Sequence, residues 1–338
     1  MSMKQKANIY QLAEATGYSV STVSKALNNT GRISASTRKI ILDKATEMNY
    51  IADYHAKALS LKKSWLIGII YSDNLGIGFG HPHFSVILES FKREVEQAGY
   101  EITFINRNMG NADMTYLEFS RYRQLEGVFI VNYYSRSKQV PELIESGMPI
   151  VSADAGYQGV TTITTDDYAG GRLATNYLID LGHDEHIVHI AGPQYTLAGQ
   201  HRLRGFRDVV SERNVPRHKV YEADNFGFED GYNQASRMLA DIDLPTALFV
   251  AGDWMALGAI KALAEHNIRV PEDISVIGYD DLAFLRYISP ALTTVAQNKT
   301  EIGRKAAQLL MQEIKGEPTE STLVDVELVV RDTCRERK

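Results

Sequence analysis

Short clusters of apolar residues recur at helical spacing over the first fifty positions and are separated by turn-forming residues. The pattern predicts three helices, over residues 9–16, 20–27 and 35–48, with Asn8, Ser19 and Ser34 placed to cap them. The apolar positions that share a face in these helices are Leu12, Ala13, Val23, Ala26, Leu27, Ile40, Ile41 and Ala45. Because a short turn containing Gly17 joins the first two helices, we expect a helix-turn-helix with a small shared core.

A different pattern starts at Trp65, where short apolar runs alternate with amphipathic stretches. Strands are expected at residues 65–71, 100–106, 127–131, 149–154, 186–191, 246–251, 274–279 and 292–296. Helices are expected at residues 84–98, 170–181, 200–213, 231–240, 253–266 and 299–314. This alternation is typical of parallel sheets covered by helices on both faces. The expected fold class is therefore an all-α headpiece followed by an α/β core of two doubly wound parallel-sheet lobes, with a ligand cleft at the carboxyl ends of the strands.

Composition changes this picture through the distribution of charge. The 338-residue chain has a formal net charge of −6, but residues 1–63 hold ten basic and four acidic side chains, a net +6 that leaves −12 on the rest. A basic head on an acidic body is typical of a DNA-binding module joined to another function, although an ordinary solvated face gives the same count. The apolar runs are too short to span a bilayer, no apolar leader opens the chain and Cys334 is the single cysteine, so we expect a cytoplasmic protein.

Residues 9–60, IYQLAEATGYSVSTVSKALNNTGRISASTRKIILDKATEMNYIADYHAKALS, resemble the headpiece and hinge of the lactose/galactose-repressor (LacI/GalR) family. The core segments SWLIGII, GGRLATNYLIDLGH, IAGP, RLRGF, ALFVAGDWMALGAIKAL, VPEDISVIGYDD and LTTVAQ are similar to family segments and stand in the same order. The resemblance implies a sequence-specific transcription repressor whose operator affinity is controlled by a sugar or sugar-derived effector bound between the lobes. It also implies a homodimer on near-palindromic double-stranded DNA, no cofactor and no enzymatic activity.

The resemblance also implies domain boundaries. The headpiece would take residues 1–50, a hinge helix and linker residues 51–63, and the two-lobed, periplasmic-binding-protein-like core residues 64–338. The parts of the first lobe would be residues 64–164 and 296–320, and those of the second lobe residues 165–295 and 321–332.

The second helix of a helix-turn-helix places its N-terminal residues at base edges in the major groove. With the apolar face of this helix turned inward, Val20, Ser21 and Lys25 face outward, and the resemblance makes them the base-contacting positions. Lys25 can donate to guanine, although the family more often has arginine there. The positions that correspond to phosphate contacts are Thr22, Ser24 and Tyr50. For each hydroxyl group, a helix cap or a solvated surface is the alternative.

Residues 52–61 are similar to the family's hinge helix, which folds on operator DNA. Leu59 corresponds to the residue that wedges into the minor groove, and Ala56 and Lys57 correspond to its neighbours. A short helix without a core is marginal by itself, so this hinge is a candidate order–disorder switch. Ala52 stands where the family usually has proline, which weakens preorganisation of the helix, and a plain linker is the alternative.

The resemblance assigns the effector site to side chains at the cleft. The corresponding positions are His83, Phe84, Asp154, Arg202, Phe226, Asp253 and Asp280. Carboxylates and guanidinium groups suit sugars because they form charge-assisted hydrogen bonds with hydroxyl groups. For Asp253, at the start of a predicted helix, an N-cap is the alternative. Gly252 replaces the asparagine that is common in the family, and Lys299 stands where some relatives place an aromatic residue, so the ligand is not assumed to be a familiar one.

Other signals carry less weight. His183, His186 and His189 are spaced three apart, but two of them lie on a predicted strand, so we expect no metal site. The glycines at 76, 78 and 80 lack the spacing of a nucleotide-binding loop, and adjacent carboxylates point apart, unlike a glycosidase pair. A periplasmic sugar receptor and a sugar-converting enzyme stay open as alternatives; the headpiece favours the regulator. The sequence names neither the effector, nor its sign as inducer or corepressor, nor the operator.

Overall fold

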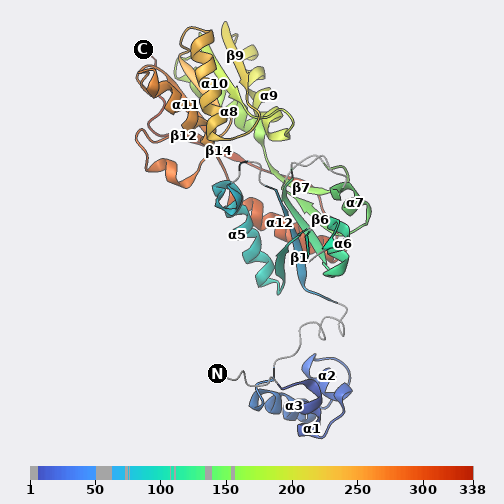
Figure 1. Cartoon of the computed structure of the whole chain (residues 1–338). Coiled ribbons are helices and arrows are strands. Elements are labelled where there is room, and N and C mark those ends of the chain that lie inside the picture. Colours follow the sequence, from blue (N-terminus) through green and yellow to red (C-terminus); the bar gives the residue numbers. More distant parts are fainter. Residues whose placement is uncertain are drawn as a thin grey trace. The chain divides into compact units, whose positions relative to one another are not determined.

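The computed structural model describes residues 7–50, 63–72, 75, 77–106, 108–109, 112–133, 139–153 and 157–337. Its contacts divide the chain into two compact units, Met1–Trp65 and Leu66–Lys338, which are described separately (Figure 1).

The first unit is a three-helix headpiece. Its helices are α1 (Ile9–Thr16), α2 (Val20–Leu27) and α3 (Ala35–Glu47). Side chains of Asn8, Ser19 and Ser34 accept hydrogen bonds from backbone N–H groups in the first turns, as N-caps do. Gly17, with φ of 72°, ends α1 in the left-handed conformation that glycine adopts without strain. The caps and turns were therefore predicted correctly from the sequence.

The first lobe of the core is a six-stranded parallel sheet with strand order β13-β7-β6-β5-β1-β2. Its strands are β1 (Leu66–Tyr71), β2 (Glu101–Phe104), β5 (Gly127–Asn132), β6 (Ile150–Ser152), β7 (Thr161–Thr165) and β13 (Thr322–Val324). Its helical elements are η1 (Gly78–Gly80), α5 (Pro82–Gln97), α6 (Tyr116–Tyr122), α7 (Gln139–Glu145) and α12 (Lys299–Ile314), and a small hairpin is formed by β3 (Asn108–Met109) and β4 (Ala112–Asp113). Separate apolar clusters beneath α5 and α12 and beneath α6 and α7 show that helices cover both faces.

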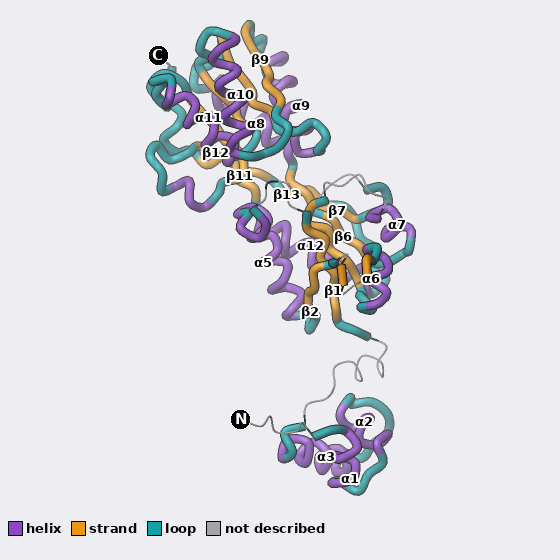
Figure 2. The backbone as a smooth tube through the Cα atoms, in the orientation of Figure 1, coloured by secondary structure: helices purple, strands orange, loops and turns teal. Residues whose placement is uncertain are grey.

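The second lobe repeats this plan with strand order β14-β12-β11-β10-β8-β9, in which only β14 pairs antiparallel. Its strands are β8 (His186–Ala191), β9 (Arg217–Glu222), β10 (Ala247–Val250), β11 (Ser275–Asp280), β12 (Thr293–Gln297) and β14 (Val326–Val329). Its helices are α8 (Asp167–Asp180), α9 (Leu197–Glu212), α10 (Phe228–Asp241), α11 (Asp253–Glu265) and η2 (Ala283–Arg286). Helices again lie on the outside of the sheet (Figure 2), over two apolar clusters. The predicted fold class is confirmed.

The chain crosses between the lobes at three places: from β7 to α8, from β12 to α12 and from β13 to β14. These crossovers are hydrogen-bonded to one another. The Thr165 hydroxyl donates to Oε1 of Gln297 at 2.6 Å, and the Asp166 N–H donates to the Val324 carbonyl at 3.0 Å. The crossovers therefore form one connected hinge between the sheets.

Several sequence predictions need correction. Ile40, predicted to be in the headpiece core, is 50% exposed, because only Ile41 and Ala45 of α3 turn inward. Strands β7 and β9 and helices α6 and α7 were missed, since they lack strong apolar runs. The first lobe extends past residue 320, because β13 pairs with β7. In the part of the chain that the structure describes, every helix is either too short or too polar to span a bilayer.

Candidate DNA-reading surface and ligand cavity

The outward face of α2 is polar and carries most of the predicted DNA contacts. Ser21 and Lys25 are exposed, whereas Thr22 and Ser24 are half-buried. Val20 is half-buried and packs against the headpiece core, so its side chain offers DNA less surface than predicted. The hydroxyl groups of Thr22 and Ser19 lie 2.9 Å apart at the N-terminal end of α2. In a helix-turn-helix this end of the second helix meets the base edges.

Lys25 and Tyr50 occupy defined positions in this unit. The aliphatic stem of Lys25 passes over Gly31, where an added Cβ would lie 3.1 Å from the lysine Cδ. Gly31 also has φ of 70°, so the turn and the lysine stem both favour glycine there. Tyr50 is half-buried and packs against the headpiece core. The predicted minor-groove residues Ala56, Lys57 and Leu59 lie outside the described residues.

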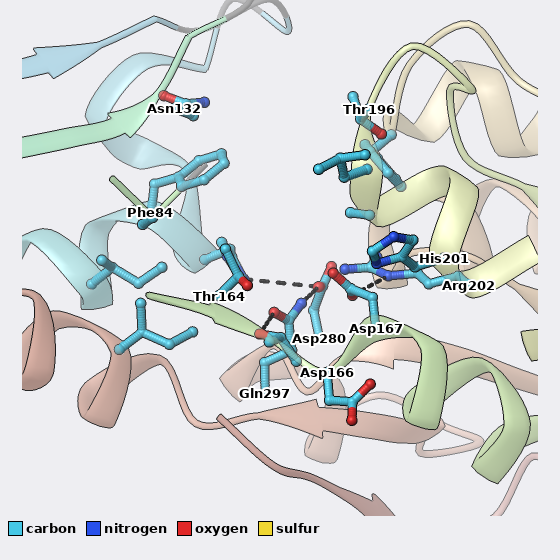
Figure 3. Close-up of a pocket in the computed structure, with 18 of the residues that line it drawn as sticks. Phe84, Asn132, Thr164, Asp166, Asp167, Thr196, His201, Arg202, Asp280 and Gln297 are labelled. Atoms are coloured by element: carbon cyan, nitrogen blue, oxygen red, sulfur yellow. Dashed lines mark hydrogen bonds and ion pairs between the residues drawn. The ribbon is translucent and has the colours of Figure 1, made fainter. Parts of the chain in front are cut away.

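A cavity of about 420 Å³ lies between the two lobes of the core, at the carboxyl ends of their strands. Its first-lobe wall is mainly apolar, and its second-lobe wall carries most of the charged and amide groups, as Figure 3 shows in part. The predicted effector residues that line it are His83, Phe84, Arg202, Phe226 and Asp280. Asp154 lies outside the described residues. The fold therefore brings together residues that are up to two hundred positions apart in the sequence.

Arg202, on α9, is part of the cavity wall but is almost fully buried. Its Nε donates to the carboxylate of Asp167 at 2.8 Å, and its Nη1 donates to the Ala251 carbonyl at 2.6 Å. The guanidinium also lies 3.7 Å from the centre of the Tyr279 ring. Burial by itself lowers the pKa of Arg202, but Asp167 and the other nearby acidic groups outweigh it and raise the pKa. Arg202 is therefore a permanent cation that also builds the wall.

Asp280 ends β11 and projects into the cavity (Figure 3). Its Oδ1 accepts a hydrogen bond from Nε2 of Gln297 at 2.5 Å and lies 3.8 Å from Nδ1 of His83, which belongs to the first lobe. Burial raises the pKa of Asp280, although Arg202 and Lys299 act in the opposite direction. Burial, together with the positive charge of Lys299, lowers the pKa of His83 well below its usual value. His83 is accordingly neutral near pH 7, and its buried Nδ1 has no hydrogen-bond partner at the cavity wall.

Asp253 does not reach the cavity. It is fully buried at the start of α11, and its two carboxylate oxygens accept hydrogen bonds from the Leu282 N–H at 2.9 Å and from the Thr294 hydroxyl at 2.7 Å. Burial, and then the charge of Asp280, raises its pKa well above the usual value. The predicted ligand contact and the N-cap alternative are both corrected: the residue supports the loop that follows Asp280, and Gly252 is the N-cap.

Phe226 and Phe84 provide aromatic surface on opposite walls. The Phe226 ring lies against Gly192, where an added Cβ would come within 2.3 Å of it, so any larger residue at 192 would displace the ring. The Phe84 ring contacts His83 and His81, with ring centroids 4.9 and 4.7 Å apart. Sugar rings and flat heterocycles both pack on such surfaces.

The sequence did not point to several residues of this cavity. Asn132, at the end of β5, is 4% exposed; its Oδ1 accepts from the Ser72 N–H, and its Nδ2 has no hydrogen-bond partner. Other polar groups at the cavity include Thr164, Asp166, Asp167, Thr196, His201, Asn225 and Gln297. Most of them lie at the ends of strands or the starts of helices, and this position in a doubly wound fold is the signal that could have found them.

His183 and His189, two of the three evenly spaced histidines, have separate surroundings. His189 lies on β8 between the rings of Phe206 and Phe249, at centroid distances of 5.0 and 4.3 Å. His183 contacts Ser275 and the Arg335 carbonyl. Within the part of the chain that the structure describes, no group of three or more His, Cys, Asp or Glu side chains is arranged to hold a metal ion.

A helix-turn-helix unit joined to a two-lobed α/β core with an interlobe cavity defines the class of ligand-responsive DNA-binding regulators. Comparisons with known proteins agree with this class. Residues 8–53 match the family of bacterial regulatory proteins called the lacI family, and residues 175–334 match the periplasmic binding protein-like domain.

Individual relatives match over nearly the whole chain. The HTH-type transcriptional repressor PurR of Pasteurella multocida (strain Pm70) is 32% identical, over 98% of this chain and 99% of its own length. The solved Lac repressor dimer bound to operator and the anti-inducer ONPF is 29% identical, with a TM-score of 0.84 over 98% of this chain and 100% of that chain. The complex of the regulator CelR with cellobiose is 26% identical, with a TM-score of 0.70 over 97% of this chain and 100% of that chain. The chain belongs to the LacI family of bacterial regulatory proteins and is a transcription regulator.

Proposed function

We propose that this protein is a homodimeric repressor that binds a near-palindromic operator in the cytoplasm, and that a small polyhydroxylated effector in the interlobe cavity controls its DNA affinity. The observation that carries the effector assignment is the cavity itself, whose walls combine the aromatic rings of Phe84 and Phe226 with charged and amide groups, most of them in the second lobe. A sugar has this dual character, because its hydroxyl groups form hydrogen bonds while its C–H face packs on aromatic rings. The relative CelR holds cellobiose. No reaction is assigned to this chain.

On this proposal Asp280, Asn132 and His83 bind the effector directly. Asp280 accepts from hydroxyl groups, Asn132 Nδ2 donates and neutral His83 acts in either direction through Nδ1. Arg202 combines contact with support of the wall. On the DNA side, Ser21 and Lys25 read bases, with Val20 at the edge of the contact.

A screen tests the effector assignment. Thermal unfolding would be followed with a panel of free sugars, phosphosugars, cellobiose and purine bases. Binding to the folded protein raises the midpoint of unfolding. Asp280→Asn and Asn132→Ala should remove most of the shift, whereas Asp243→Asn, at an exposed position before β10, should retain it. A purine-only response would reject the sugar assignment, and equal loss in the control would reject the site.

Mobility shifts on DNA selected from a random library test the readout by α2. Lys25→Ala should weaken binding to the selected site by about 1–3 kcal/mol and relax the preference at one base pair in each half-site. Lys44→Ala removes the same charge from α3, where Lys44 pairs with Glu47, and should leave the base preference unchanged. Equal effects of the two substitutions on all sequences would show that α2 is not the recognition helix.

A further inference from the structure

The backbone beneath the effector site is held in an unfavourable conformation. At the end of β11, Asp280 has φ of 123° and Asp281 has φ of 51°. Non-glycine residues rarely adopt such values, and two in succession persist only where the surroundings hold them. Because Asp280 projects into the cavity from this turn, the turn sets the position of its carboxylate.

Several side chains converge on the turn, and most belong to the second lobe. Gln297, at the end of β12, donates to the Asp280 carboxylate, and Arg331, after β14, donates to the Asp281 carboxylate, both at 2.5 Å. Asp253 accepts from the N–H of Leu282, the residue that follows the turn. These contacts hold two side chains and one amide group, but not the carbonyl groups of the turn itself.

Lys299 contacts those carbonyl groups. Its ammonium group donates to the Asp280 carbonyl and, at 3.3 Å, to the Asp281 carbonyl. Lys299 is the first residue of α12, and α12 packs against α5 in the first lobe. The turn in the second lobe is therefore held by a side chain that comes from a first-lobe helix, one residue beyond the interlobe crossover. An ammonium group suits this task, since it offers three donors and a positive charge to two backbone acceptors.

We propose that Lys299 is the positioning residue for Asp280: it stabilises the left-handed turn from the first lobe and thereby ties the orientation of the effector-binding carboxylate to the crossover. Lys299 itself does not line the cavity, so it acts through the turn. The effect of Lys299 on the effector response rests on the proposed function. Its positioning of the turn does not, and this positioning can be measured without effector.

Hydrogen exchange of the full-length protein tests the positioning role. Lys299→Met keeps a long side chain and removes its donors. The amide groups of residues 281–286 should then exchange about tenfold faster, the effect expected when a charge-assisted hydrogen bond no longer opposes local opening. Lys305→Met is the matched control, because Lys305 also lies on α12 and pairs with Glu301 at 3.7 Å near the surface. The control should exchange as the wild type does.

Trp254 offers a second measurement. Its ring lies 5.4 Å from that of Phe284 in η2, directly after the turn, and the other tryptophan, Trp65, can be replaced by phenylalanine. In that background Lys299→Met should shift the Trp254 emission to the red while the midpoint of thermal unfolding stays near that of Lys305→Met. Unchanged exchange and emission would overturn the proposal. Faster exchange spread over the whole second lobe with a lowered midpoint would also overturn it, since Lys299 would then serve only overall stability.

Discussion

Arg202 illustrates how a single residue can both line a site and support it. It is 5% exposed, and its guanidinium group joins Asp167, the Ala251 carbonyl and the Tyr279 ring. From the sequence, Arg202 was expected to be a ligand contact that operator binding does not require. Its burial changes that expectation, because removal of one member of a buried ion pair leaves the other charge without compensation.

We therefore expect Arg202→Ala to lower the free energy of unfolding by about 3–5 kcal/mol, in addition to any loss of effector binding. Arg172→Ala is the comparison, since Arg172 pairs with Glu212 across the same two helices at 2.7 Å but at the surface. It should cost at most about 1 kcal/mol. Urea denaturation of both variants measures the difference, and equal effects would show that burial of the Arg202 pair does not matter.

The buried His189 should lower the free energy of unfolding of the protein at low pH. Burial lowers its pKa from 6.5 to about 3, outweighing the hydrogen bond to the Phe249 carbonyl. Because the pKa in the folded state lies below that in the unfolded state, protons bind preferentially to the unfolded chain. The contribution of His189 is complete above pH 6.5 and decreases as the pH falls toward 3, by at most about 1.4 kcal/mol per pH unit.

Denaturation at pH 7 and pH 5 tests this expectation. His189→Gln should show a weaker dependence on pH over this interval than the wild type does, whatever its stability at pH 7. His218→Gln, at an exposed position on β9, should keep the wild-type dependence. If the His189 variant also keeps it, the acid sensitivity of the protein arises at other residues.

At the scale of elements, glycines set how closely the helices of the second lobe approach each other. A Cβ added at Gly258 on α11 would lie 2.0 Å from the Phe228 carbonyl, and one added at Gly231 on α10 would lie 1.9 Å from the Met255 carbonyl. The two helices thus meet backbone to backbone at reciprocal glycines. This contact fixes α11, whose first residue, Asp253, supports the loop after Asp280.

Gly258→Ala should consequently destabilise the protein by about 1–3 kcal/mol or more, because backbone atoms must move to admit the methyl group. Gly80→Ala is a suitable control: its φ is not positive, and the nearest atom to an added Cβ is 3.5 Å away. Thermal and urea unfolding of the two variants provide the measurement. A Gly258 variant as stable as the control would mean that α10 and α11 can separate without penalty.

At the scale of the whole molecule, the regulator must connect its two activities. If one conformational equilibrium serves both, effector and operator must change each other's affinity by the same factor, about 5- to 150-fold. A movement of one lobe relative to the other must change the three crossovers between them. These crossovers are joined by the hydrogen bonds from Thr165 to Gln297 and from Asp166 to Val324.

Titration of a ligand found in the screen, with and without operator, measures this reciprocity. Leu59→Ala serves as a separate variant: by the family resemblance it should weaken operator binding strongly and leave ligand affinity without DNA unchanged. Identical ligand affinity with and without operator would exclude coupling, even if each partner bound well.

The proposed dimer has its own test, since light scattering at micromolar concentration should report a dimer.

The sequence by itself determined the local and repetitive features of this protein. Helix caps at Asn8, Ser19 and Ser34 depend on neighbouring residues, and apolar strand-helix alternation depends on which faces must be buried, so both are written in short windows. Family resemblance added residues that the fold then gathered at one cavity, Arg202 and Asp280 among them.

Only the tertiary structure decided what these residues do there. The sequence offered Asp253 either a ligand contact or an N-cap and could not show that it is buried with both oxygens occupied, whereas Asp280 reaches the cavity. It also gave no sign of Asn132 or of the link from Lys299 to the turn at Asp280. Burial, free hydrogen-bonding capacity and contacts between distant segments arise when separate elements pack together, and no short window of the chain contains them.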